Sequence, residues 1–304
     1  MGRLLSYSGI STKIRAMQSK LISESEIQEM LQFTSVSHAA AWLKRTPEYA
    51  KAWADLDENS LHRGQIEKLL KASIFKDFSK IYQFANPEQR KFLDLYSRRY
   101  EIRVLKEIMT NLFDHKSTDA VDVSPYCDFF RRHSKLDLDR LTACTTMDEF
   151  INTLKGNEFY VPLSRIQNHD TALLFDYGMA LDLYYFSMIW NVRKKLFSGK
   201  DLEQITTAYG EKFDMLNLQF ISRSKRYFSM SPADIYALLI PMNYKLKKEE
   251  ITALVEASTR EEAQQIFRKT YYGKKYDHLS AHNLEEFYNY MLRTTLEKAS
   301  RKDP

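Results

Sequence analysis

Residues that could bind a metal ion are few in this chain, and two histidines form the first candidate pair. His278 and His282 are four residues apart, a spacing that would place both imidazoles on one face of a helix. A protein zinc site takes three or four ligands, and this pair comes without a third. We therefore interpret both histidines as surface residues, and the sequence predicts no metal site.

A thiol is the second candidate. Cys127 comes shortly before Arg131 and Arg132, and neighbouring guanidinium groups could lower the thiol pKa and make it a nucleophile. We favour the alternative, a small buried residue beside two solvated arginines. The spacing of Cys127 and Cys144 fits no metal site, and we interpret both as reduced thiols in a cytosolic setting.

Nucleotide-binding motifs are missing from the sequence. Neither GxxxxGK[ST] nor GxGxxG occurs, and Gly199-Lys200 is followed by Asp201 rather than by a hydroxyl residue. The paired carboxylates Glu261 and Glu262 fit the start of a helix, where negative charge is favoured, better than acid–base catalysis. The sequence therefore predicts no catalytic residue and no cofactor.

The elements that would position any site are helices. The chain has 304 residues but only 8 glycines and 7 prolines, too few for many tight hairpins. One apolar stripe recurs at every fourth residue: Phe92, Tyr96, Tyr100, Val104, Ile108 and Leu112. Asn86-Pro87 marks a turn before this stripe, and a second helical hairpin is predicted around Gly199, with Asp201 as N-cap. We predict an all-α protein.

Three segments of the chain repeat one pattern. Ser35, Thr146 and Thr259 could each cap a helix with a hydroxyl, and Glu149 and Glu262 fit capping boxes. Eight residues after each cap, a side chain is expected to face the core: Leu43, Leu154 and Phe267. A tyrosine follows where each helix should end: Tyr49, Tyr160 and Tyr272. We expect each tyrosine ring to pack between units while its hydroxyl reaches a polar partner.

The caps are 111 and 113 residues apart, which indicates domain-sized copies rather than solenoid repeats of about 20–50 residues. We predict three helical units, 1–114, 115–228 and 229–304, around a pseudo-threefold axis. A helical hairpin follows each of the first two capped helices, but the third unit has one hairpin helix. We therefore expect the native protein to continue by one more helix.

Family-like motifs accompany this triplication. SYSGISTKIRAMQSKL carries Tyr7, Ile10, Lys13, Arg15 and Ala16; MLNLQFISR carries Asn217, Leu218 and Arg223; LLIPMNYKLKKEEI carries Ile240, Pro241 and Leu246. With these motifs, nearly the whole chain resembles the C-subunit family of the prokaryotic A/V-type (V-type) ATPases, which is related to the d subunit of the eukaryotic V-ATPase. The first unit departs from the pattern, because YEIRVLKEI stands where MLNLQFISR would be expected. The missing last helix is a second departure.

The resemblance implies a non-catalytic rotor subunit in the central stalk, built as a funnel from three helical units. Its implied partners are the shaft subunits D and F and the membrane ring of proteolipid subunits, with no nucleic acid and no membrane span. Such a subunit would take part in ATP synthesis and ion transport, including hydrogen ion transport. It would sit peripherally on the cytoplasmic face of the membrane.

Basic clusters leave other functions open. Two basic clusters lie near aromatic residues in the sequence. The first is Arg223, Lys225 and Arg226, and the second is Lys245, Lys247 and Lys248. Cations beside aromatics are typical of proteins that bind single-stranded nucleic acid, but we favour the interpretation that the clusters are solvated helix ends. The candidate partner contacts are Lys13, Arg15, Arg223 and Arg226. A helical scaffold and a nucleic-acid binder, both unrelated to ATPases, are the alternative functions.

Overall fold

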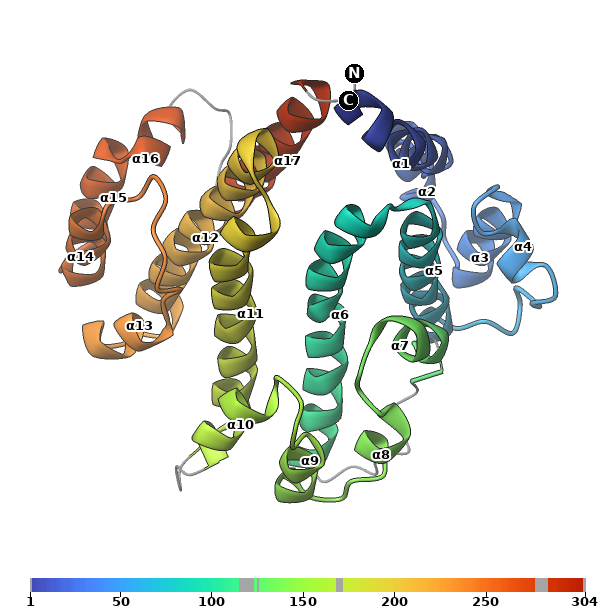
Figure 1. Ribbon diagram of the computed structural model, residues 1–304, viewed down its shortest axis with the longest axis horizontal. Helices are drawn as coiled ribbons and strands as arrows, with labels where there is room; N and C mark the ends of the chain where they lie inside the picture. Colours follow the sequence, from blue (N-terminus) through green and yellow to red (C-terminus); the bar gives the residue numbers. More distant parts are fainter. Residues whose placement is uncertain (1, 115–122, 125, 168–171, 277–283, 303–304) are drawn as a thin grey trace. The chain divides into compact units, whose positions relative to one another are not determined.

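This computed structural model describes residues 2–114, 123–124, 126–167, 172–276 and 284–302, so His278 and His282 lie outside the described residues. Throughout these ranges the regular structure is α-helical, and no strand is found. The predicted all-α class is confirmed (Figure 1). No described helix is long and apolar enough to span a lipid bilayer.

The chain divides into two compact units, residues 1–160 and 161–303. The helices of unit 1 are α1 (Gly2–Gln18), α2 (Glu24–Met30), α3 (Val36–Arg45), α4 (Ala50–Trp53), α5 (Arg63–Phe84), α6 (Pro87–Phe113), α7 (Cys127–His133), α8 (Leu138–Thr142) and α9 (Met147–Thr153). Helix α10 (Tyr160–Gln167) begins at the boundary. The helices of unit 2 are α11 (Leu174–Leu196), α12 (Gly199–Tyr227), α13 (Pro232–Leu238), α14 (Lys248–Glu256), α15 (Arg260–Lys269), α16 (Tyr271–Tyr276) and α17 (Leu284–Lys302).

Both units contain a long helical hairpin, as the apolar stripes predict. In unit 1, Asn86 caps α6 by accepting the Gln89 N–H at 2.9 Å, and Pro87 occupies the first helical position. In unit 2, Gly199 has a φ of 53° and opens α12, with Ser198 at the N-cap. The expectation that Asp201 is the N-cap was wrong, because the left-handed glycine starts the helix earlier and leaves Asp201 in the first turn.

Aromatic rings fill the core of unit 1. Phe75 of α5 lies 5.0 Å from Tyr100 of α6 and 5.1 Å from Phe129 of α7, between ring centroids. Tyr126, just before α7, meets Phe75 edge-on at 4.8 Å. Offset and edge-on ring pairs of this kind stabilise a core by about 0.5–1.5 kcal/mol each beyond their buried area. Helix α7 is therefore fastened to the α5–α6 hairpin.

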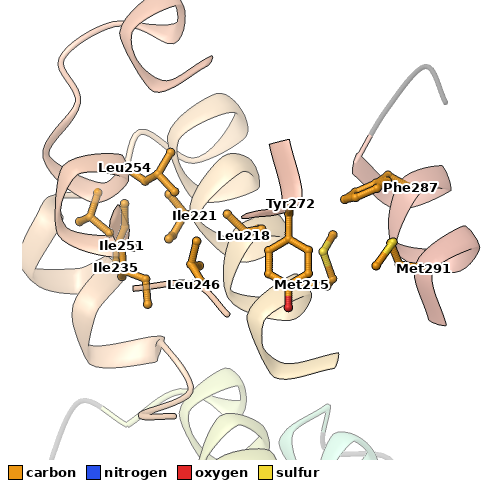
Figure 2. Packing of buried hydrophobic residues seen from close by; sticks show 11 residues of the cluster. Met215, Leu218, Ile221, Ile235, Leu246, Ile251, Leu254, Tyr272, Phe287 and Met291 are labelled. Carbon is orange, nitrogen blue, oxygen red and sulfur yellow. The ribbon is translucent and has the colours of Figure 1, made fainter. Parts of the chain in front are cut away.

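The core of unit 2 gathers residues from five helices around α12 (Figure 2). Buried members of this core are Met215, Leu218, Ile221, Ile235, Leu246, Ile251, Leu254, Val255, Tyr272, Phe287 and Met291. Phe287 and Met291 place α17 against α12, and Tyr272 is fully buried beside them. Packing this dense makes α12 the structural axis of the unit.

A strained residue follows the C-cap of α12. Ser229 has a φ of 46°, in the left-handed region that non-glycine residues rarely occupy, and the Met230 N–H bonds the Ser224 carbonyl oxygen at 3.3 Å. We expect Ser229→Gly to raise the free energy of unfolding by about 0.5–1 kcal/mol, because glycine adopts this conformation without the Cβ clash. Urea denaturation followed by circular dichroism measures the change. A destabilised glycine variant would show that the serine hydroxyl makes a contact worth more than the strain.

Candidate functional site

Three hydroxyl caps begin equivalent helices. Ser35 Oγ accepts the His38 N–H at 3.1 Å at the start of α3. Thr146 Oγ1 accepts the Glu149 N–H at 3.2 Å, and Thr259 Oγ1 accepts the Glu262 N–H at 3.1 Å. Each cap has extended backbone angles, so all three chain segments enter their helices in the same way.

The two glutamates depart from the capping box in its usual form. Glu149 Oε2 accepts the N–H of Thr145 at 2.9 Å, and Glu262 Oε2 accepts the N–H of Ser258 at 2.8 Å. Both carboxylates therefore reach one residue further back than the N-cap, to the residue before it. His38 stands at this position in the first copy and stacks on Phe33, with ring centroids 4.1 Å apart.

A polar residue stands eleven positions after each cap, as the C-cap of α3 and α15 and in the turn after α9, a feature that the repeat pattern did not predict. Its N–H bonds the carbonyl oxygen of the residue three positions earlier in every copy. These bonds are Thr46 to Leu43 at 3.0 Å, Asn157 to Leu154 at 2.8 Å, and Thr270 to Phe267 at 3.0 Å. Leu43 and Leu154 are buried, and Phe267 is half-buried against the unit 2 core. In the sequence, a threonine or asparagine eleven residues after each cap could have indicated this feature.

The three tyrosines differ in their surroundings. Tyr272 is fully buried, whereas Tyr49 and Tyr160 are half-buried. Phe159 is also fully buried and stands thirteen residues after its cap, as Tyr272 does. By burial and by distance from the cap, Phe159 and not Tyr160 is the equivalent of Tyr272. The tyrosines lie at the start of the short helix that follows, and do not end the capped helix.

Asp214 on α12 is the centre of a buried hydrogen-bond network. Its carboxylate accepts the backbone N–H groups of Tyr244 at 3.0 Å, Lys245 at 2.6 Å and Leu246 at 2.9 Å. The Tyr272 hydroxyl donates a fourth bond at 2.8 Å. Burial raises the pKa of Asp214, and these four bonds oppose that shift. Burial and the nearby carboxylate also raise the pKa of Tyr272, so its hydroxyl keeps the proton that it donates.

Asn217, one turn further along α12, holds the same segment by its backbone. Its side-chain amide donates to the Ile240 carbonyl oxygen at 3.0 Å, and its side-chain oxygen accepts the Ile240 N–H at 2.9 Å. Asn217 and Ile240 belong to two separate sequence motifs, MLNLQFISR and LLIPMNYKLKKEEI. The structure brings these motifs together, which gives both a structural role.

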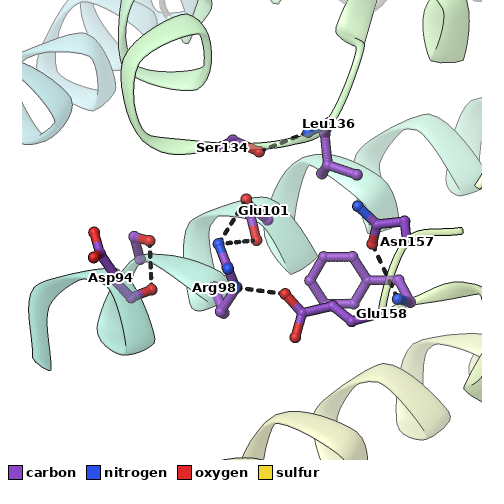
Figure 3. A network of polar contacts seen from close by, with 9 residues as sticks. Asp94, Arg98, Glu101, Ser134, Leu136, Asn157 and Glu158 are labelled. Carbon is purple, nitrogen blue, oxygen red and sulfur yellow. Dashed lines mark hydrogen bonds and ion pairs between the residues drawn. The ribbon is translucent and has the colours of Figure 1, made fainter. Parts of the chain in front are cut away.

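Glu101 on α6 stands 113 residues before Asp214 and is also buried (Figure 3). Arg98 Nη1 donates to both of its carboxylate oxygens at 3.2 Å. Arg98 Nε also pairs with Glu158 at 2.6 Å. Burial raises the pKa of Glu101, while the Arg98 charge and the Ser134 hydroxyl oppose that shift.

Both buried carboxylates lie beside a segment that leads into a helix. Glu101 interacts with the Ser134 hydroxyl in the segment before α8, and Asp214 holds the segment at residues 244–246, before α14, by hydrogen bonds. Glu101 has an arginine as its principal partner, whereas Asp214 has a tyrosine and backbone N–H groups. These groups hold one helical layer to the next. Among the described residues, no cluster of three or more His, Cys, Asp or Glu side chains could hold a metal ion.

The candidate basic residues lie at separate places in the structure. Arg15, Arg223 and Arg226 are exposed, and Lys13 lies 4.9 Å from the centre of the Phe84 ring. Lys225 Nζ donates to the Ala257 carbonyl oxygen at 2.5 Å. Lys245 is exposed, and its Nζ lies 4.7 Å from the centre of the neighbouring Tyr244 ring.

Cys127 is half-buried and Cys144 is buried, and both are free thiols. Cys127 is therefore less enclosed than the favoured interpretation of a buried residue required.

A family model described as the ATP synthase (C/AC39) subunit matches residues 10–304. The C subunit of the A-type ATP synthase of Methanosarcina mazei is 23% identical over 255 residues, covering 82% of this chain and 67% of that protein. The equivalent protein of Methanosphaera stadtmanae is 20% identical over 284 residues, covering 91% and 69%. That of Methanocaldococcus jannaschii is 22% identical over 225 residues, covering 73% of this chain and 55% of that protein. The chain therefore spans little more than half the length of this last relative.

Proposed function

We infer the function from the family to which the chain belongs, the ATP synthase (C/AC39) subunit family. It is a non-catalytic subunit of the central stalk of an A/V-type ATPase, and it rotates with the stalk. On one side it binds the shaft formed by subunits D and F. On the other it binds the membrane ring of proteolipid subunits, and so couples rotation to ion transport on the cytoplasmic face of the membrane.

The observation that carries this proposal is the family match over nearly the whole chain, joined to a recurring helical unit. The three capped helices share their first hydrogen bond, and the residue eleven positions after each cap makes the same backbone bond. This supports a triplicated origin and three units around a pseudo-threefold axis. A rotor adaptor has to resist torsion, and buried carboxylates that fasten one helical layer to the next contribute to that stiffness.

The exposed arginines are the proposed contacts with the partners. Arg223 and Arg226 lie near the C-terminal end of α12, beside the exposed rings of Tyr227 and Phe228, and Arg15 lies on α1. Arginine and large aromatic side chains are enriched at protein interfaces. A nucleic-acid role receives less support, because Lys225 is held by a hydrogen bond to the Ala257 carbonyl oxygen.

Reconstitution tests the proposed function. The full chain is mixed with a co-expressed D–F shaft and, separately, with the detergent-solubilised proteolipid ring, and each mixture is run on size-exclusion chromatography. We expect co-elution with both. Binding to neither component would overturn the rotor role and favour a scaffold outside the ATPase. Binding to a labelled oligonucleotide at low salt, with neither component bound, would favour the nucleic-acid alternative.

A further inference from the structure

A cavity of about 590 Å³ opens in unit 1 between α6, α8 and the turn that follows α9. Its wall includes four cations, Arg98, Lys135, Arg140 and Lys155, and two carboxylates, Asp137 and Glu158. Gly156 has a φ of 85°, so the turn that forms this wall depends on a glycine. The volume is within the range of about 300–1,000 Å³ that is usual for ligand sites.

Positive charge predominates in this cavity. Lys135, Arg140 and Lys155 are exposed, and none of them forms an ion pair with a carboxylate in the part of the chain that the structure describes. The fourth cation, Arg98, is already engaged by Glu101 and Glu158. Three cations at one opening therefore repel one another and favour an anionic partner.

The two carboxylates in the wall restrict which class of anionic partner the cavity can bind. Glu158 pairs with Arg98, and Asp137 Oδ1 accepts the Arg140 backbone N–H at 3.2 Å. A compact polyanion such as pyrophosphate would place its charge against these carboxylates. A peptide presents carboxylates for the three cations and N–H groups for Asp137 and Glu158 at the same time. No aromatic ring stands among the lining residues, so a base has nothing to stack on.

We propose that this cavity binds an acidic peptide segment of a partner protein, with Lys135, Arg140 and Lys155 as the recognition residues. The three exposed cations contact glutamate or aspartate side chains of the segment. Buried Leu136, Leu141 and Leu154 form the floor under its aliphatic parts. The site is independent of the rotor role, since any partner with such a segment would satisfy it.

Fluorescence anisotropy tests the site on the full chain. The probe is a labelled peptide of alternating glutamate and glycine, compared with a glutamine peptide of the same length, and unlabelled pyrophosphate is a competitor. A Lys135→Gln, Arg140→Gln, Lys155→Gln variant removes the three cations. The control variant carries Arg45→Gln, Lys71→Gln and Lys76→Gln, which removes the same types of exposed charge elsewhere in unit 1.

We expect the glutamate peptide to bind at low salt and the glutamine peptide not to bind. The cavity variant should lose about tenfold or more in affinity, while the control variant changes by less than about threefold. Equal losses in both variants would mean general attraction to a basic protein and would overturn the site. No peptide binding, or binding of pyrophosphate alone, would overturn the peptide proposal, the second in favour of a small-anion site.

Discussion

Replacing Asp214 with alanine should lower the free energy of unfolding by about 3–5 kcal/mol, the range observed when one partner of a buried charged network is removed. The reason is that three backbone N–H groups, at Tyr244, Lys245 and Leu246, lose their acceptor inside the fold. The Tyr272 hydroxyl loses its acceptor as well. Urea denaturation measures the loss, and amide exchange at residues 244–246 shows whether this segment opens first.

Tyr272→Phe is the matched control for Asp214. It keeps the buried ring and removes one of the four bonds, so we expect a loss of only about 1–2 kcal/mol. The amides of residues 244–246 should stay protected in this variant. If both variants lose the same free energy, the backbone bonds to Asp214 contribute nothing, and the carboxylate would not be the element that fastens the segment before α14.

Local hydrogen bonds were predictable from the sequence because they depend on nearby residues. A hydroxyl before an apolar run signals an N-cap, and Ser35, Thr146 and Thr259 take that position. Apolar stripes signal helices in the same local way, so the all-α class and both hairpins followed. Asp201 was misplaced because a left-handed glycine can begin a helix, and the residue pattern does not distinguish this from a helix end.

The buried carboxylates could not be predicted in the same way. A charged residue within a helix pattern is typical of a solvated face, and only long-range packing shows that Glu101 and Asp214 point inward. Their partners lie about 30 residues away in the chain, at Ser134 and at residues 244–246. Asn217 was visible in the sequence as part of a motif, but its contact with Ile240 needed the folded chain. The available signal was that Glu101 and Asp214 are 113 residues apart, nearly the same separation as the repeated caps.

Arg98→Met should lower the free energy of unfolding by about 3–4 kcal/mol at neutral pH. Methionine keeps the aliphatic contacts but leaves Glu101 buried without its cation, and Glu158 loses its partner too. Lys91→Met is the control, because Lys91 pairs with Glu88 on the surface, and we expect a change below about 0.5 kcal/mol. Thermal and urea denaturation of the two variants give the comparison.

The loss in the Arg98 variant should depend on pH. Burial already raises the pKa of Glu101, and removing the arginine charge raises it further. Between the unfolded and the folded pKa, the folded state holds a proton that the unfolded state has released. The penalty is therefore full above the folded pKa, shrinks as the pH falls below it, and is gone below the unfolded pKa. The Arg98→Met loss should thus be smaller at about pH 5 than at about pH 8.

Adding Glu101→Gln should recover part of the stability and remove this pH dependence, since the amide carries no charge to leave unpaired. A loss that is equal at both pH values, and unchanged by Glu101→Gln, would mean that packing of the Arg98 stem, and not charge pairing, stabilises this part of unit 1.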